Sequence, residues 1–194
     1  MNTNLRMRTL CMGLALALTF GAVAPAALAQ SMDAQSTVMV GGAAMYPSRN
    51  IIQNAMNSRD HTTLVAAVKA AGLVSTLEGP GPFTVFAPTN EAFAALPAGT
   101  VTTLLKPENK AMLAKILTYH VVAGRLTAAD LAAAVAAGDG KAMLKTVEGD
   151  SLTVTKDGDR WAITDDHGDT AHVTIGNVMQ SNGVIHVIDK VLMP

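Results

Sequence analysis

The chain has 194 residues, of which 15% are charged, and a formal net charge of −1 at pH 7. This length suits one globular domain, which buries roughly two thirds of the surface of its unfolded chain. The weak negative charge and the scattered lysines argue against a nucleic-acid partner, because they leave no basic patch for a phosphate backbone. The one cysteine, Cys11, lies near the N-terminus. The rest of the chain therefore relies on its core and not on disulfides, which fits a bacterial periplasm or exterior.

The N-terminus has the features of a signal peptide. Two arginines precede an apolar run from Leu10 to Val23, and Ala27-Leu28-Ala29 gives the small-x-small pattern that a signal peptidase recognises. We predict cleavage after Ala29, so that the protein is secreted or periplasmic and meets the membrane only during export. The alternative is an uncleaved membrane anchor, since the run is nearly long enough to span a bilayer. Pro25 and the lack of a following basic cluster argue against it.

Residues 30–47, which include Gly41-Gly42 and Pro47, are interpreted as a linker, part of which can dock on the domain. The domain covers residues 48–194, and its first half is mainly helical. Thr89 or Asn90 can cap one short helix, and Thr127 with Asp130 forms a capping-box pattern. Apolar residues at helical spacing predict helices around 51–56, 64–71, 73–77, 90–96, 107–117 and 128–137, with short strands at 83–86 and 119–122.

The second half changes to the two-residue alternation of β-strands. Leu152 and Val154 alternate with threonines, and Asp157-Gly158 predicts a turn before the next strand. A polar loop at 165–169 separates this hairpin from two further strands at 173–175 and 184–188. Helices early and strands late predict an α+β fold with a mostly antiparallel sheet.

Three segments then indicate a family. The run from Thr84 to Phe93, the pair Tyr119-His120 with its two following valines, and the run from Asn182 to Pro194 resemble, in order and spacing, the signatures of fasciclin-like domains. The resemblance covers residue 48 to the end. It implies a wedge-shaped β-sandwich with helices packed along one side, in a secreted or surface-bound module for cell adhesion and protein contact.

The same resemblance makes Tyr119 and His120 the candidate partner-binding residues. A structural role is the alternative, because buried polar groups must find partners, and Asn90 is a plausible partner for His120. His186 alternates with Ile185 and Val187, so we expect it on the opposite face of the sheet, also in a structural role.

No residues indicate catalysis, a cofactor or a metal. The loop Asp165–Asp169 lacks the ordered oxygen spacing and distal glutamate of a calcium loop. His167 and His172 are predicted to point to opposite faces, which leaves zinc without a cage. There is no Gly-x-Ser-x-Gly elbow and no phosphate loop.

Two functions remain open. The first is an exported adhesion or protein-interaction module that binds a protein or a cell-surface or matrix polymer. The alternative is an extracytoplasmic carrier of a small molecule or lipid, held in a cleft between helices and sheet. Ligand found by mass spectrometry after purification would favour the carrier.

Overall fold

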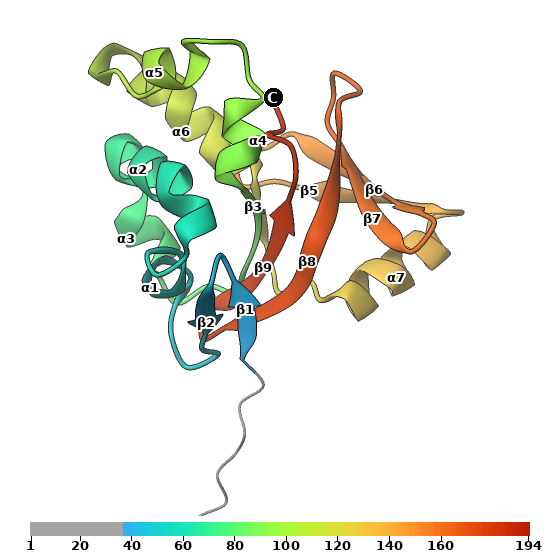
Figure 1. Ribbon diagram of the computed structural model, residues 1–194. Coiled ribbons are helices and arrows are strands. Elements are labelled where there is room, and N and C mark those ends of the chain that lie inside the picture. Colours follow the sequence, from blue (N-terminus) through green and yellow to red (C-terminus); the bar gives the residue numbers. More distant parts are fainter. Residues whose placement is uncertain (1–36) are drawn as a thin grey trace, which may run out of the picture. The chain divides into compact units, whose positions relative to one another are not determined.

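The computed structural model describes residues 37–194, so the predicted signal peptide and its cleavage site lie outside the described residues. Helices dominate the first half of the described chain, as the sequence predicts (Figure 1). Within residues 37–194, no helix is both long and apolar enough to cross a membrane. The helical elements are α1 (Ile51–Ala55), η1 (Arg59–His61), α2 (Thr62–Ala71), α3 (Val74–Leu77), α4 (Asn90–Ala94), α5 (Thr100–Leu104), η2 (Pro107–Asn109), α6 (Lys110–Tyr119) and α7 (Ala128–Ala137).

Side-chain caps fix where several of these helices begin. The predicted capping box of α7 is present, because Thr127 accepts a hydrogen bond from the Asp130 amide at 3.3 Å while the Asp130 carboxylate accepts one from the Thr127 amide at 2.8 Å. Thr89, not Asn90, caps α4 through the Ala92 amide. Such caps satisfy amides that have no partner inside the helix, which is why polar residues precede these segments.

The strands form a seven-stranded sheet in the order β4-β3-β9-β8-β7-β6-β5. Only β3 and β9 pair in parallel; the other neighbours are antiparallel, as predicted. Both of these strands are almost entirely buried, as is usual for parallel pairing. The strands are β3 (Phe83–Pro88), β4 (Val121–Ala123), β5 (Lys141–Lys145), β6 (Ser151–Asp157), β7 (Arg160–Thr164), β8 (Thr170–Gln180) and β9 (Gly183–Ile188).

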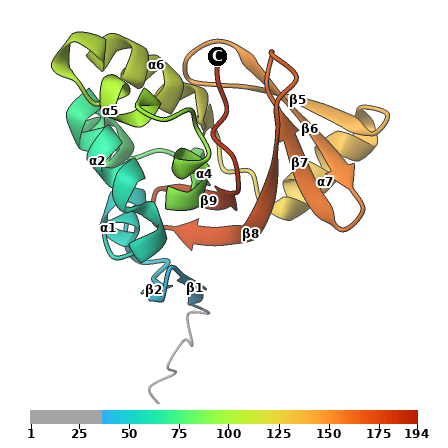
Figure 2. The same ribbon diagram turned by 45° about the horizontal axis from the view of Figure 1, so that its top comes forward.

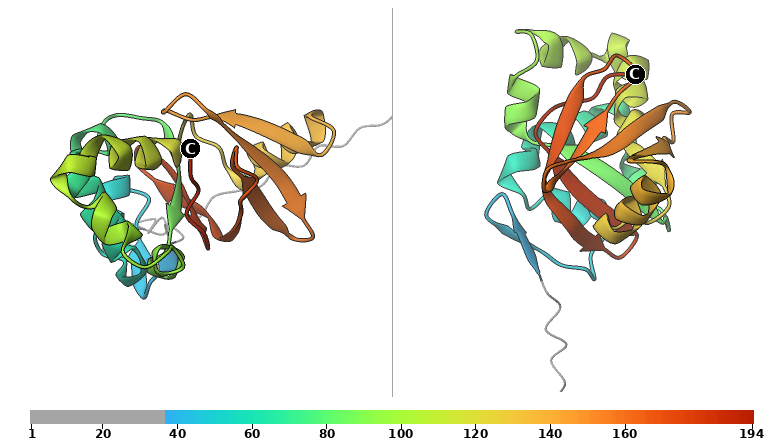
Figure 3. Two further views of the ribbon diagram at one scale, coloured as in Figure 1. Left: turned by 90° about the horizontal axis from the view of Figure 1, so that it is seen from above. Right: turned by 90° about the vertical axis from the view of Figure 1, so that its right-hand side faces the viewer.

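The pair of sheets expected from the family resemblance is realised as this one strongly bent sheet. The long strand β8 runs through both parts, and its pairing with β9 shifts register on either side of Ile175. Such irregularities bend a strand and increase its twist. A bridge between Val122 and Thr146 brings the two edge strands together. One core lies between the sheet and α1–α6, and a second lies between the sheet and α7 (Figure 3).

A small hairpin precedes the first helix, within the segment interpreted from the sequence as a linker that can partly dock on the domain. Strands β1 (Val38–Val40) and β2 (Ala43–Met45) pair across Gly41-Gly42, both of which have positive φ. Val40 and Met45 are buried in the first core. A Cβ at Gly41 would approach the Asp60 amide nitrogen to 2.7 Å, so the turn fits closely against η1. The folded unit therefore begins before residue 48 (Figure 2).

Candidate functional site

The predicted partner-binding residues lie inside the molecule. Tyr119 is the last residue of α6 and His120 is its C-cap, so the strand expected at 119–122 begins only at Val121. Tyr119 has no exposed surface, and His120 is 2% exposed. Neither side chain can touch a partner directly in this structure. A role of this segment in partner contact therefore stays a prediction, and it would have to be indirect.

Both ring nitrogens of His120 have partners. Nδ1 lies 2.8 Å from the Ile116 carbonyl, which accepts only from an N–H, while Nε2 accepts a hydrogen bond from the Leu192 amide at 3.1 Å. These two bonds define a neutral imidazole protonated on Nδ1. Burial lowers the pKa of His120 to about 4, against the opposing effects of the Ile116 carbonyl and Asp165. His120 thus ties the last turn of α6 to the C-terminal segment.

Tyr119 ties the same helix to the predicted polar loop. Its hydroxyl accepts a hydrogen bond from the Asp166 amide at 3.2 Å and donates a longer one, 3.4 Å, to the Ser151 carbonyl. Burial raises the pKa of Tyr119 to about 12, and the nearby carboxylates of Asp166, Asp165 and Asp150 act in the same direction. The hydroxyl therefore stays protonated at physiological pH.

The loop Asp165–Asp169 closes around a buried carboxylate. Asp165 is 6% exposed, and its Oδ1 accepts from the His167 and Asp169 amides. Its Oδ2 accepts from the Met193 amide at 3.1 Å, which fastens the C-terminal segment to the loop. Tyr119, His120, this loop and residues 192–193 together form a junction between α6, the sheet and the end of the chain. Each polar side-chain group of this junction described here makes a hydrogen bond within the domain. This supports a structural role for Tyr119 and His120.

The structure separates Asn90 from His120. Asn90 instead accepts from the Thr63 amide at 3.0 Å and donates to the Arg59 carbonyl at 2.7 Å, so it caps α2 from a distance. The expected pairing of Asn90 with His120 is therefore wrong, because the side-chain amide of Asn90 binds the start of α2 instead.

His186 occupies the face of β9 opposite its neighbours Ile185 and Val187, as predicted. It stacks on Phe86 with ring centroids 5.8 Å apart, and its Nε2 lies 2.8 Å from the Leu126 carbonyl. Burial lowers the pKa of His186. These contacts fit a structural role inside the sheet.

The loop histidines diverge. His167 contacts the Met193 carbonyl, whereas His172 lies between the carboxylates of Asp157 and Asp189 at 3.3 and 3.7 Å. In the part of the chain that the structure describes, no group of three or more histidine, cysteine, aspartate or glutamate side chains is placed to hold a metal ion.

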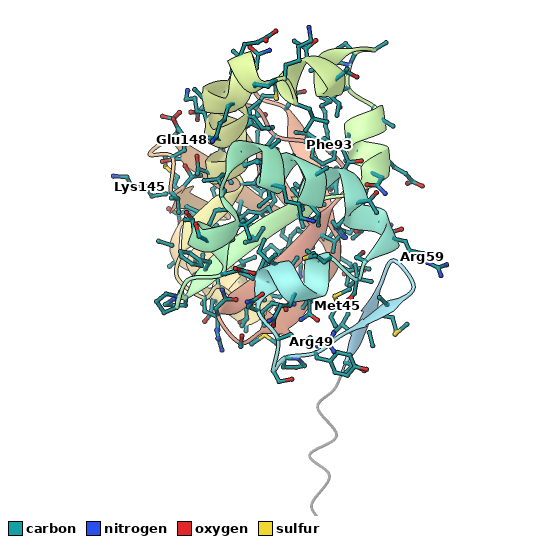
Figure 4. All side chains as sticks on the ribbon, turned by 90° about the vertical axis from the view of Figure 1, so that its left-hand side faces the viewer. Met45, Arg49, Arg59, Phe93, Lys145 and Glu148 are labelled. Atoms are coloured by element: carbon teal, nitrogen blue, oxygen red, sulfur yellow. The ribbon has the colours of Figure 1, made fainter. Side chains whose placement is uncertain are left out.

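The exposed site that sequence reasoning missed surrounds the β1–β2 hairpin. Met39 on β1 is 58% exposed, and Tyr46, which follows β2, is 41% exposed. The guanidinium of Arg49 lies over the Tyr46 ring, 4.9 Å from its centroid, which is cation–π geometry. Figure 4 shows Arg49 at the base of the hairpin and Arg59 beyond its turn. We call Met39, Tyr46, Arg49, Arg59 and Arg125 the hairpin surface.

Buried amides hold the hairpin in place. Asn54 of α1 exchanges two hydrogen bonds with the main chain of Tyr46, at 3.1 and 2.8 Å, and also donates to the side chain of Gln180 at the end of β8. Asn54 is fully buried. The hairpin surface is therefore presented by a fixed element and not by a free linker. The sequence signal that could have revealed it is Gly41-Gly42 between two short apolar segments.

An apolar cavity lies beneath the hairpin. It offers about 40 Å³ of space to the centre of a water molecule and is lined almost entirely by apolar side chains, among them Val40, Met45 and Val178. Buried His61 also lines it, and the Nε2 atom of His61 has no hydrogen-bond partner. A single water needs roughly 10–15 Å³ by the same measure. The cavity thus has room for a few waters, far less than a lipid needs.

Comparison with known proteins identifies the fold and the family. Protein sll1483 of Synechocystis is 47% identical over 168 residues, which are 87% of this chain and 86% of that protein. Immunogenic protein MPB70 of Mycobacterium bovis is 34% identical over 145 residues, 72% of this chain and 66% of that protein. The solved domain pair of the insect cell adhesion molecule fasciclin I has a TM-score of 0.68 at 19% identity, over 83% of this chain and 59% of that chain. Residues 59–194 match the fasciclin domain, and the chain belongs to the fasciclin domain family.

Proposed function

We propose that this protein is an exported adhesion or protein-interaction module, without catalytic activity, that contacts its partner through the hairpin surface. The family consists of adhesion-type domains, and the fold is shared with an insect cell adhesion molecule. A similar protein from Mycobacterium bovis, 33% identical over 190 residues, is described as a cell surface glycolipoprotein, which supports a position outside the cytoplasm.

The observation that carries this proposal is the composition of the hairpin surface. Aromatic residues, methionine and arginine are enriched in the centres of protein interfaces, whereas lysine and acidic residues are depleted. Tyr46 and Met39 are large and exposed, and the guanidinium of Arg49 lies over the Tyr46 ring. Aromatic and arginine side chains that already contact each other lose less conformational freedom on binding, which favours affinity.

The junction at Tyr119 and His120 has a different role in this proposal. Its hydrogen bonds hold α6 against the sheet and the C-terminal segment, and α6 packs on α2 in the first core. We propose that changes there alter partner binding only by loosening the domain. Loss of stability would then accompany any loss of adhesion.

The test is adhesion of cells or envelope material to surfaces coated with the exported protein. Tyr46→Ser and Met39→Ser should each lower adhesion several-fold without changing the melting temperature, because both side chains are exposed. Met143→Ser on β5 is the matched control, since Met143 is 76% exposed and lies on a different surface. Equal losses in all three variants, or none in the hairpin variants, would reject the hairpin surface as the contact.

The alternative function, an extracytoplasmic carrier, is limited by the cavity beneath the hairpin. Its apolar lining suits only a neutral molecule about the size of a few waters. Mass spectrometry of the protein purified under native conditions would detect such a ligand at one per chain. Its absence from protein that adheres normally would leave adhesion as the function.

A further inference from the structure

The arginines of the described chain are unevenly placed. Of the four arginines in residues 37–194, three belong to the hairpin surface, and the fourth, Arg160, lies on β7. The ion pairs among the described residues involve lysines and a histidine but none of these arginines. Although the whole chain has a net charge of −1, the carboxylates of residues 37–194 do not neutralise these guanidinium groups.

Two of these arginines contact Ser181, in the turn between β8 and β9, one through its guanidinium and the other through its main chain. Arg125 donates from Nη2 to the carbonyls of Gln180 and Ser181, each at 3.3 Å. The Ser181 amide donates to the Arg49 carbonyl at 2.9 Å, which places Arg49 beside the same turn. The guanidinium of Arg49 lies over the Tyr46 ring, so both guanidinium groups have contacts within the domain before any partner arrives.

The remaining arginine extends this charge to the other end of the hairpin. The Arg59 amide donates to the Gly41 carbonyl in the hairpin turn, and its side chain is exposed in Figure 4. Asp60 lies next to Arg59 in sequence, and Glu78 belongs to the loop that Asn182 binds through the carbonyls of Leu77 and Gly79. Neither carboxylate pairs with an arginine of the hairpin surface.

Carboxylates fit this arrangement best. A guanidinium is a planar fork of donors that pairs with a carboxylate through two parallel hydrogen bonds, which the ammonium of a lysine cannot do. The exposed Tyr46 and Met39 beside the arginines are typical of contact with protein and not with a uniformly polar polymer. The combination selects an acidic segment of a protein.

We propose that the hairpin surface binds an acidic segment of a partner protein, whose carboxylates pair with Arg49 and Arg125 while its apolar side chains cover Met39 and Tyr46. This inference rests on the proposed adhesion function and names the chemistry of its partner. The charges also raise the rate of encounter with an acidic partner, so binding weakens as salt screens them.

The test uses a fluorescent twelve-residue peptide of glutamate, leucine and serine, and a matched peptide with glutamine for glutamate, titrated with the exported protein. We expect the glutamate peptide to bind at least about tenfold more tightly than the glutamine peptide, with an advantage that shrinks in about 0.5 M salt. Arg49→Glu and Arg125→Glu should each weaken binding at least about tenfold, because they replace attraction with repulsion. Arg160→Glu, which makes the same change in net charge on β7, should alter it less than twofold.

Other outcomes overturn the inference. If Arg160→Glu weakens peptide binding as much as Arg49→Glu does, only the net charge of the protein matters. If the glutamine peptide binds as tightly as the glutamate peptide, the surface does not recognise carboxylates. Tighter binding to alginate or to phosphatidylglycerol vesicles than to the glutamate peptide would assign the surface to a polysaccharide or a lipid. If Arg125→Glu lowers the melting temperature, Arg49→Glu alone decides, since the Arg49 guanidinium lies over the exposed Tyr46 ring. If the Arg49→Glu variant still adheres, the inference of an acidic partner is wrong but the adhesion function stands. If the unchanged protein does not adhere at all, the adhesion function itself is wrong.

Discussion

Replacing His120 by glutamine should remove a measurable part of the pH dependence of stability. The folded protein holds the pKa of His120 at about 4, whereas an unfolded histidine has a pKa near 6.5. The unfolded state therefore binds the proton more readily. The stabilisation by neutral His120 is complete above pH 6.5 and is lost progressively as the pH falls from 6.5 to 4.

The size of the effect follows from these two pKa values. Proton linkage gives a loss of about 2 kcal/mol in the free energy of unfolding between pH 7.5 and pH 5, and about 3 kcal/mol by pH 4. His61 and His186 also have pKa values lowered by burial and shift stability in the same direction. Both histidines are present in the variant and in the unchanged protein. Their contributions therefore cancel when the free energy of unfolding of the variant is subtracted from that of the unchanged protein.

Urea denaturation of both proteins, from about pH 7.5 to pH 5, gives the difference in the free energy of unfolding at each pH. The variant should be less stable at pH 7.5, because the Leu192 amide and the Ile116 carbonyl lose their partner. The difference should then shrink by about 2 kcal/mol by pH 5. Parallel pH curves for the two proteins would refute the neutral, buried state of His120 on which the reasoning depends.

Three further predictions concern other parts of the molecule. Tyr119→Ala should cost about 3–5 kcal/mol, because it empties the space of a fully buried ring, and adhesion should fall only as far as the folded fraction does; a stable variant with lost adhesion would contradict this. A chelator should leave the melting temperature unchanged, because the described residues provide no metal cluster, and a drop of several degrees that calcium restores would show a missed site. The exported protein should have the mass of a chain that begins at Gln30, and a mass that retains Arg6 and Arg8 would refute cleavage after Ala29.

Local chemistry determined much of this protein from the sequence alone. The helix starts at Thr89 and Thr127, the alternation along β6 and the turn at Asp157-Gly158 depend on residues a few positions apart, so their patterns were readable. The α+β class and the family followed from the same kind of information, since helices came early and the three fasciclin-like segments appeared in order.

Tertiary structure decided the environment of the candidate residues. His120 is neutral because it is buried, and its Nε2 is unavailable to a partner because Leu192, 72 positions away, donates to it. The hairpin is part of the domain because Asn54 and Gln180, 126 positions apart, meet beneath it. Arg49 and Arg125 lie near each other only because the main chain of Arg49 and the guanidinium of Arg125 both contact Ser181. Such contacts depend on how the bent sheet brings distant segments together, and no short-range pattern in a single sequence records them.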